Sequence, residues 1–350
     1  MMHAAIGVIL FGLTLQSCNA FSLTILHNND FHSRFAPTTS DGAPCNATIS
    51  TCIAGAARTT YLVSLVNHFH DITVNYLCNT FMQAHKLKQE EENVIFLSAG
   101  DFFQGSLWYT LFKEPVISDI VPDMGYDATC LGNHEFDDHA EGLYRFVDNM
   151  TALGIPVLAA NLDLSDVPLL HNVKKSAVLN VSGTQVGIIG YLTPDTIFLS
   201  GPDETVRFND EIEEVRKEAK KLKEQGVQIL IALGHSGYAK DMEIAEKVED
   251  LDIVVGGHTN TFLWSKSFGE KPSNEVPLGD YPTVIKHGDR ETLVVQAFAY
   301  GKYLGKLHVE FDDNGDVKSY SGRPILMDET IPEGEMCITM IAADFASTFR

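Results

Sequence analysis

Five apolar runs in this chain are each followed closely by histidine, aspartate or asparagine, and this pattern restricts the fold more than any other feature. The runs have the continuous apolar character of strands that are buried on both faces in α/β proteins. In most cases a glycine precedes the polar residue, which lets the backbone turn sharply at the strand end. Ligands bind at the carboxyl ends of strands in such sheets. The polar residues at these ends are Asp30, His32, Asp101, Asn133, His134, His235, His258 and Asn260.

Helical segments separate the apolar runs. Apolar residues recur at helical spacing in residues 141–153 and in a helix that begins after Asn209 or Asp210 and ends at Gln225. Residues 106–121 are predicted to form a further helical segment. The alternation predicts βαβ units and a largely parallel or mixed sheet. The predicted strands are residues 22–26, 93–98, 128–131, 155–160, 185–192, 227–233, 252–255, 292–298 and 303–311.

The polar set has the composition of a metal centre. Imidazole nitrogens together with carboxylate and amide oxygens suit hard-to-borderline divalent cations. Two cations held about 3.5–4 Å apart need a bridging carboxylate. Asp101 stands alone at its strand end and is the natural bridge. Each residue alone is a weak signal, but five strand ends with the same chemistry predict a two-metal centre.

The motifs around these residues resemble those of a known enzyme family. HNNDFHSRF, AGDFFQGSLWY, LGNHEFD, IALGHSGY and VVGGHTNTFL resemble the calcineurin-like metallophosphoesterases and, more closely, the 5′-nucleotidase family. That family includes ecto-5′-nucleotidase, bacterial UDP-sugar hydrolases and secreted salivary apyrases. The resemblance extends from about Leu23 to Pro332. It implies an α/β fold with two mixed β-sheets flanked by helices, an α-β-β-α sandwich.

The resemblance also assigns expected roles to the polar residues. It implies two divalent ions, usually Zn²⁺, with Mn²⁺, Mg²⁺, Ca²⁺ or Co²⁺ as substitutes. One ion would be held by Asp30, His32, Asp101 and Asn260. The other would be held by Asp101, Asn133, His235 and His258. His134 would be the catalytic imidazole, oriented by Asp137, and Asn133 and His134 would contact the substrate.

The chemistry of these residues fits phosphoryl transfer. A water activated by the metals would attack phosphorus in line, while His134 stabilises charge or protonates the leaving oxygen. Glu135 is expected to lie behind the site or on the surface without a catalytic role. Arg58 and Asn161 are weaker candidates for supporting the centre.

The substrate is left open among nucleotides. Hydrolysis of AMP to adenosine and phosphate is favoured slightly over apyrase activity on ATP and ADP. The alternatives are a non-catalytic secreted protein that binds nucleotides or a partner, and a phosphatase with another substrate.

In the family, a separate C-terminal domain stacks the nucleotide base between aromatic side chains. We expect residues 21–332 to form the catalytic domain, residues 333–350 to be a divergent linker remnant, and that C-terminal domain to be absent.

Other features predict a secreted protein. Residues 1–20 read as a signal peptide. Cys45 and Cys52 flank a short polar loop and could form a disulfide in an oxidising compartment, whereas Cys130 is expected to be a buried thiol. Asn46, Asn149 and Asn180 are glycosylation acceptors. No further segment predicts a membrane anchor.

The composition excludes a nucleic-acid partner, because the formal net charge is −22 and no basic patch is visible. Metal cations would supply the positive charge that an anionic substrate needs. Residues 66–84 mix aromatic, histidine and asparagine residues without a clear period. They are interpreted either as an insertion, such as translated unspliced sequence, or as an ordinary surface loop.

Overall fold

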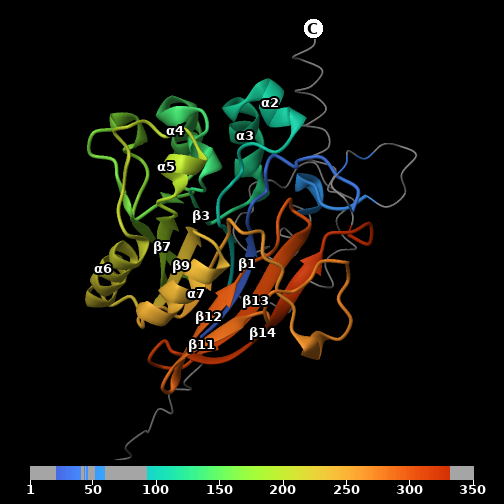
Figure 1. The fold of residues 1–350 in the computed structure, drawn as a ribbon. Coiled ribbons are helices and arrows are strands. Elements are labelled where there is room, and N and C mark those ends of the chain that lie inside the picture. Colours follow the sequence, from blue (N-terminus) through green and yellow to red (C-terminus); the bar gives the residue numbers. More distant parts are fainter. Residues whose placement is uncertain (1–20, 41–42, 44, 46–51, 60–92, 332–350) are drawn as a thin grey trace, which may run out of the picture.

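The computed structural model describes residues 21–40, 43, 45, 52–59 and 93–331 (Figure 1). Several predictions concern residues outside this range and stay predictions. They are the signal peptide at residues 1–20, the glycosylation acceptor Asn46, the insertion at residues 66–84 and the linker remnant at residues 333–350.

Two six-stranded sheets form the centre of the molecule. The first has the strand order β14-β13-β1-β2-β3-β4. Its strands are β1 (Ser22–Asn28), β2 (Val94–Ser98), β3 (Ala128–Cys130), β4 (Val157–Leu158), β13 (Tyr303–Phe311) and β14 (Val317–Leu326). β1 to β4 run parallel to one another, while β13 pairs antiparallel with both β1 and β14.

The second sheet has the strand order β11-β12-β10-β9-β7-β6. Its strands are β6 (Ser176–Val181), β7 (Thr184–Leu192), β9 (Ile229–His235), β10 (Ile253–Val255), β11 (Thr283–His287) and β12 (Arg290–Val295). The four central strands are parallel, and the two edge strands are antiparallel to their neighbours. A small third sheet pairs β5 (Leu162–Asp163) with β8 (Arg207–Phe208).

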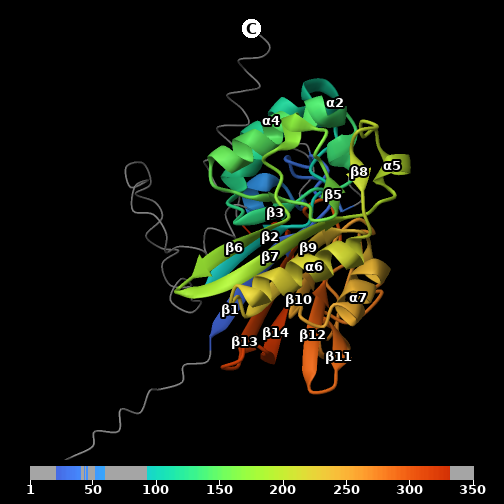
Figure 2. The ribbon, with the colours of Figure 1, turned by 90° about the vertical axis from the view of Figure 1, so that its left-hand side faces the viewer.

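Helices cover the outer face of each sheet (Figures 1 and 2). On the side of the first sheet lie α2 (Leu107–Phe112), α3 (Glu114–Ile120) and α4 (His139–Ala152), and on the side of the second lie α6 (Glu211–Glu224) and α7 (Tyr238–Lys247). The one-turn helix α5 (Thr196–Leu199) follows β7. The short 3₁₀ helices are η3 (Val121–Met124), η4 (His134–Phe136), η5 (Pro168–Leu170) and η6 (Lys266–Phe268).

Alternation along the strands builds the layers. Because successive strand residues point to opposite faces, Ile95 and Leu97 of β2 enter the core between the sheets, whereas Phe96 packs toward the helices. In β9, Ile231 enters the same inter-sheet core, and Leu230 packs against the helices on the other side. This four-layer arrangement confirms the predicted α-β-β-α sandwich.

Two differences from the predicted elements have physical causes. The helix expected at residues 106–121 is divided into α2 and α3 by Lys113, whose φ is 57°. Pro115 in the first turn of α3 lacks the N–H that a continuous helix would need. The sequence also gave no prediction for α7 or for the edge strands β6, β11 and β14.

The cysteines and acceptor asparagines within the described residues lie as follows. A disulfide joins Cys45 and Cys52, and Cys130 is a buried free thiol. Asn149 is exposed on α4, and Asn180 is exposed where β6 turns into β7. In the part of the chain that is described, no helix has the length and apolar character needed to cross a bilayer.

Candidate metal centre

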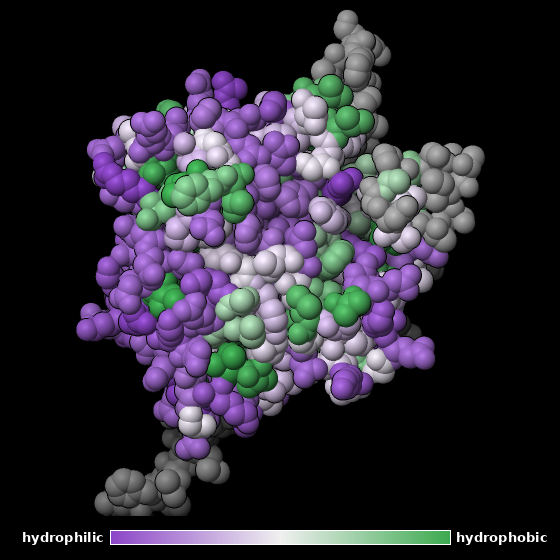
Figure 3. Space-filling view, viewed as in Figure 1, coloured by the Kyte–Doolittle hydropathy of each residue, from purple (hydrophilic) through white to green (hydrophobic). Residues whose placement is uncertain are grey.

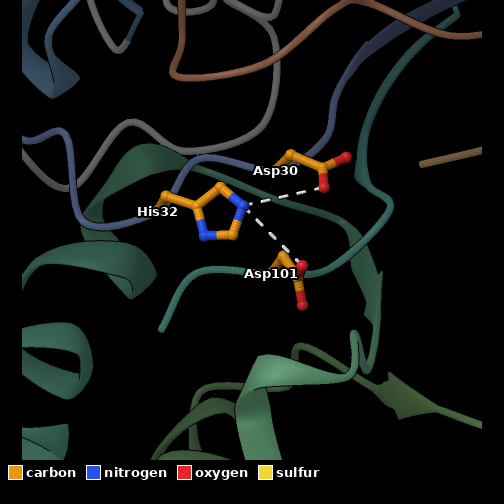
Figure 4. A group of neighbouring side chains, drawn as sticks. All are labelled: Asp30, His32 and Asp101. Carbon is orange, nitrogen blue, oxygen red and sulfur yellow. Dashed lines mark ion pairs between the residues drawn. The ribbon is translucent and has the colours of Figure 1, made fainter. Parts of the chain in front are cut away.

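Loops from both sheets bring the predicted residues to one end of the sandwich. Asp30 and His32 follow β1, Asp101 follows β2, and Asn133 and His134 follow β3. From the second sheet, His235 is the last residue of β9, while His258 and Asn260 follow β10. Figure 4 shows the side chain of His32 pointing between the carboxylates of Asp30 and Asp101.

Four of these side chains form the centre of the cluster. His32 Nε2 lies 3.8 Å from Asp30 Oδ1 and 3.8 Å from Asp101 Oδ2. His235 Nε2 lies 3.8 Å from Asp30 Oδ1 and 2.9 Å from Asp101 Oδ2. One ligand atom each from Asp30, His32 and Asp101 lie within 4.8 Å of one another. A cation placed among them would therefore be reached from two loops, those that follow β1 and β2.

The backbone at the centre is strained. Asp30, His32, Asp101, His258 and Asn260 all have φ values between 50° and 78°. Non-glycine residues rarely adopt this left-handed conformation, which costs of order 1–3 kcal/mol for each residue. The surrounding structure must therefore hold five such residues in place, and such strain is typical of functional sites.

The histidines are oriented to leave one nitrogen available. His32 Nδ1 lies 3.1 Å from the carbonyl oxygen of Phe103, and His235 Nδ1 lies 2.6 Å from that of Ala99. In a neutral ring, a hydrogen bond to a carbonyl keeps the proton on Nδ1, so Nε2 is the nitrogen that would bind a metal. Both Nε2 atoms face the carboxylates.

Two buried polar atoms without hydrogen-bond partners also fit a metal site. His235 Nε2 and Asn260 Oδ1 are buried and have no hydrogen-bond partner among the described residues. The approach of His235 Nε2 to Asp101 does not align as a hydrogen bond, although it is short. Buried polar atoms normally have partners. These donor atoms fit a divalent cation, so the residues present fit the metals that the sequence predicts.

His258 and Asn133 form the second part of the cluster. His258 Nδ1 lies 2.9 Å from Asn133 Oδ1, and the ring centres of His258 and His235 are 5.1 Å apart. The backbone N–H of His258 donates to Asp30 Oδ2 at 2.9 Å. The loops after β3 and β10 are thus in contact through Asn133 and His258, and His258 is hydrogen-bonded to Asp30.

Charge interactions shift the pKa values of the central residues. Burial alone would raise the pKa of Asp101, but the neighbouring imidazoles of His235 and His32 hold it well below its usual range. Burial alone would lower the pKa of His235, but Asp101 and Asp30 raise it to about 10. Burial raises the pKa of Asp30. Burial, with the charge of His235, lowers the pKa of His258 to about 4.

His134 and Asp137 form a pair at the edge of the centre. His134 Nδ1 lies 2.8 Å from Asp137 Oδ2, and the His134 ring lies 5.4 Å from that of His32. The hydrogen bond with Asp137 raises the pKa of His134 to about 9. About a third of the His134 side chain is exposed, so this imidazole can meet a substrate that enters from solvent.

Glycines allow the loops to approach one another. A Cβ at Gly132 would lie 2.1 Å from Asp101 Oδ1, and one at Gly256 would lie 1.8 Å from Asp241 Oδ2. A Cβ at Gly257 would meet His235 Nδ1 at 2.9 Å. Side chains at these positions would clash with the Asp101 loop, with helix α7 (Tyr238–Lys247) and with His235, so the glycines of the motifs are needed for close packing.

Comparison with known proteins places the chain in a family. The family model described as calcineurin-like phosphoesterase matches residues 23–262. This chain belongs to the calcineurin-like phosphoesterase family. The match includes every residue of the cluster described above.

Several relatives of this phosphoesterase are 5′-nucleotidases. It is 43% identical over 324 residues to the 5′-nucleotidase of Mus musculus, covering 91% of this chain and 51% of that protein. It is 39% identical over 340 residues to the snake venom 5′-nucleotidase of Gloydius brevicauda, covering 94% of this chain and 52% of that protein. The chain thus spans about half the length of these curated relatives.

A solved structure has the same fold as this chain. The 5′-nucleotidase precursor from Thermus thermophilus matches it with a TM-score of 0.77 at 32% identity, over 94% of this chain and 59% of that one. The predicted fold class is therefore confirmed by a relative as well as by the layers and sheet order described above.

The sequence also singled out Glu135, Arg58 and Asn161, and the structure shows which groups each of them contacts. Glu135 is fully buried and accepts backbone hydrogen bonds from the Asp101 loop, so the surface position considered for it is wrong. Its burial raises its pKa to about 7. Arg58 donates to the carbonyls of residues 54 and 331, and Asn161 binds the backbone of residues 192 and 209.

Sequence reasoning missed two buried amides that support the centre. Asn29 donates to Asp30 Oδ2 at 2.7 Å and accepts a hydrogen bond from the backbone of Ala297. Gln296 accepts from the N–H of Thr261 and donates to the carbonyl of Gly257, bracing the loop that carries His258. Asn29 lies inside the HNND motif, which was the available signal, whereas nothing in the sequence around Gln296 indicates its role.

Helix α5 places apolar side chains close to the polar centre. Asn133 Nδ2 donates to Ser200 Oγ at 3.4 Å, and Ser200 directly follows α5. Ile197, Phe198 and Leu199 of α5 are exposed and lie where Figure 3 shows an apolar patch on a largely hydrophilic face.

Proposed function

We propose that the described domain is the catalytic part of a 5′-nucleotidase that hydrolyses nucleoside 5′-monophosphates such as AMP to the nucleoside and phosphate. The observation that carries the proposal is the meeting of Asp30, His32, Asp101 and His235 from three strands of two sheets. The names of the relatives supply the substrate class.

The expected metal ligands keep the roles assigned from the motifs. Asp101 would bridge two divalent ions. Asp30, His32 and Asn260 would complete one set of ligands, and Asn133, His235 and His258 the other. When bound, the ions, with Zn²⁺ as the first candidate, would neutralise phosphoryl oxygens and lower the pKa of the water that attacks phosphorus in line.

The protein's own residues would complete the reaction. His134 lies at the exposed edge of the cluster, where its Nε2 could donate a hydrogen bond to the transferring phosphoryl group or a proton to the leaving oxygen. Asp137 holds His134 Nδ1 and so fixes the direction of Nε2. Asn133 would contact a phosphoryl oxygen beside it.

Phosphate release tests the proposal. The purified protein is assayed for phosphate released from AMP, ADP and ATP and for glucose 1-phosphate released from UDP-glucose, with Zn²⁺ or with EDTA. We expect release from AMP to exceed release from the other substrates and to be lost in EDTA. Preferential release from ATP and ADP would replace the proposal with apyrase activity. Folded, metal-loaded protein that releases no phosphate from any substrate would favour a nucleotide-binding role.

We also propose that the protein is secreted and glycosylated. The Cys45–Cys52 disulfide and the exposed side chains of Asn149 and Asn180 support this. Asn180 is the better acceptor, because it lies at a hairpin turn, whereas Asn149 lies within a helix. Secretion of the protein from eukaryotic cells, followed by mass analysis before and after glycan removal, tests the idea. Retention inside the cells without glycans would refute it.

A further inference from the structure

The carboxylate of Glu135 joins the two loops that carry the expected bridging ligand and the expected catalytic imidazole. Its Oε2 accepts hydrogen bonds from the N–H of Asp101 at 3.0 Å and of Gly132 at 2.5 Å. Its Oε1 accepts from the N–H of Phe102 at 2.7 Å and of Phe103 at 3.2 Å. The side chain has no exposed surface. One buried carboxylate therefore satisfies four backbone donors.

These four bonds fix the backbone that presents Asp101. Asp101 has a φ of 58° and follows Gly100, whose φ is 78°. Without an acceptor, the buried N–H groups around this turn would lose their partners, and unpaired buried donors are costly. The Asp101 carboxylate then accepts the N–H of His134 at 2.9 Å. These hydrogen bonds link Glu135 to Asp101 and Asp101 to His134, so they fix the positions of the two loops relative to each other.

We propose that Glu135 is a positioning residue that sets the bridging carboxylate of Asp101, and that an amide of the same shape cannot replace it. This inference rests on the proposed metal centre. A glutamine offers one oxygen and one NH₂ group. In either orientation of the amide, its NH₂ would face two backbone N–H donors, so two of the four bonds would be lost.

Hydrogen exchange of the wild-type protein in EDTA tests the positioning without any metal. We expect the amides of Asp101, Phe102, Phe103 and Gly132 to exchange as slowly as those of the central strands. Exchange as fast as that of the exposed turn at Asp313 and Asn314 would overturn the proposal. This measurement does not depend on a variant that folds or on any activity.

Metal binding of the Glu135→Gln variant provides the second test. We expect its affinity for Zn²⁺, measured by titration calorimetry, to fall about 10- to 100-fold, and the Asp101 and Gly132 amides to exchange faster. The matched control is Glu114→Gln. Glu114 is also buried, but it contacts the Ser118 hydroxyl on α3, so this control should bind Zn²⁺ as the wild type does.

The outcomes separate this inference from the proposed function. Wild-type affinity for Zn²⁺ in folded Glu135→Gln would overturn the role of Glu135 while leaving the metal centre intact. A wild type that binds no Zn²⁺ but protects the four amides in EDTA would refute the metal centre and leave the loop arrangement standing. If Glu135→Gln does not fold, the exchange data on the wild type decide.

Discussion

Individual side chains determine what this centre can hold. The expected metal ligands could be proposed from the sequence because each lies within a few residues of the end of an apolar run. Their roles, and those of the pair His134 and Asp137, came from the resemblance to a known family. The supporting residues could not be found in that way. Asn29 contacts Phe298, 269 residues away, and Gln296 contacts Asp241, 55 residues away. Such contacts depend on how the loops meet, which no local pattern encodes.

The first prediction concerns the bridging position. Asp101→Asn removes the charge that faces both His32 and His235, so the protein should retain fewer than two Zn²⁺ ions and lose activity by about 100-fold or more. Elemental analysis after dialysis, with phosphate release from AMP, measures both. Asp250→Asn, before the start of β10, should retain wild-type values. Two ions retained in Asp101→Asn would refute the bridging role.

The second prediction concerns the imidazole at the edge. His134→Ala should lower kcat by about 10²- to 10⁴-fold, because a general acid contributes on that scale, while two metal ions remain bound. The control is His171→Ala, an exposed histidine beside η5. Steady-state kinetics and metal analysis of the same preparations separate a catalytic defect from metal loss. Full turnover by His134→Ala would remove this residue from the mechanism.

At the scale of elements, burial explains which strands the sequence could predict. β9 is buried at all seven positions and β10 at all three, so both gave clear apolar runs. β14 is exposed or partly exposed at nearly every position, and β6 and β11 are similar. In edge strands of this kind, apolar and polar residues alternate only weakly and the open side carries polar residues, so their sequences resemble those of loops.

Asp252 ties three strands of the second sheet together and gives a third prediction. It accepts the N–H of Leu230 at 2.8 Å and pairs with Arg290 at 3.2 Å. Burial raises its pKa to about 7, above the value of about 3.9 in an unfolded chain. Between about pH 4 and pH 7 the folded state keeps a proton that the unfolded state has lost. Stability should therefore fall as the pH rises through this window, by at most about 1.4 kcal/mol per pH unit.

Urea unfolding from pH 4.5 to pH 8 checks this effect, with EDTA present so that metal binding does not contribute. Asp252→Asn cannot ionise, so its free energy of unfolding should fall less steeply with pH than that of the wild type. Asp250→Asn should follow the wild type. Parallel curves for Asp252→Asn and the wild type would show that Asp252 titrates normally.

At the scale of the whole molecule, the sandwich could be predicted because buried runs alternate with amphipathic helices and because the motifs resemble those of a known family. The division of the strands between two sheets came from the resemblance and not from the patterns themselves. Alternation predicts parallel pairing, but it does not say which strands share a sheet.

A fourth prediction links metal binding to global stability. A ligand that binds only the folded state adds about 2.7 kcal/mol to stability when its free concentration is 100 times its Kd. Zn²⁺ should therefore raise the Tm of the wild type by several degrees relative to EDTA. Differential scanning calorimetry measures the shift, which should shrink in Asp101→Asn. An unchanged Tm over a wide range of Zn²⁺ concentrations would contradict a folded-state metal site.

The origin of the centre in two different sheets has a mechanical consequence. Asp30, Asp101 and Asn133 belong to the first sheet, and His235 and His258 belong to the second. The thickness of the apolar layer between the sheets therefore sets the gap across which the two halves of the centre must meet. Packed interiors transmit strain, so the removal of a methyl group deep in that layer should shift the residues from the two sheets relative to each other.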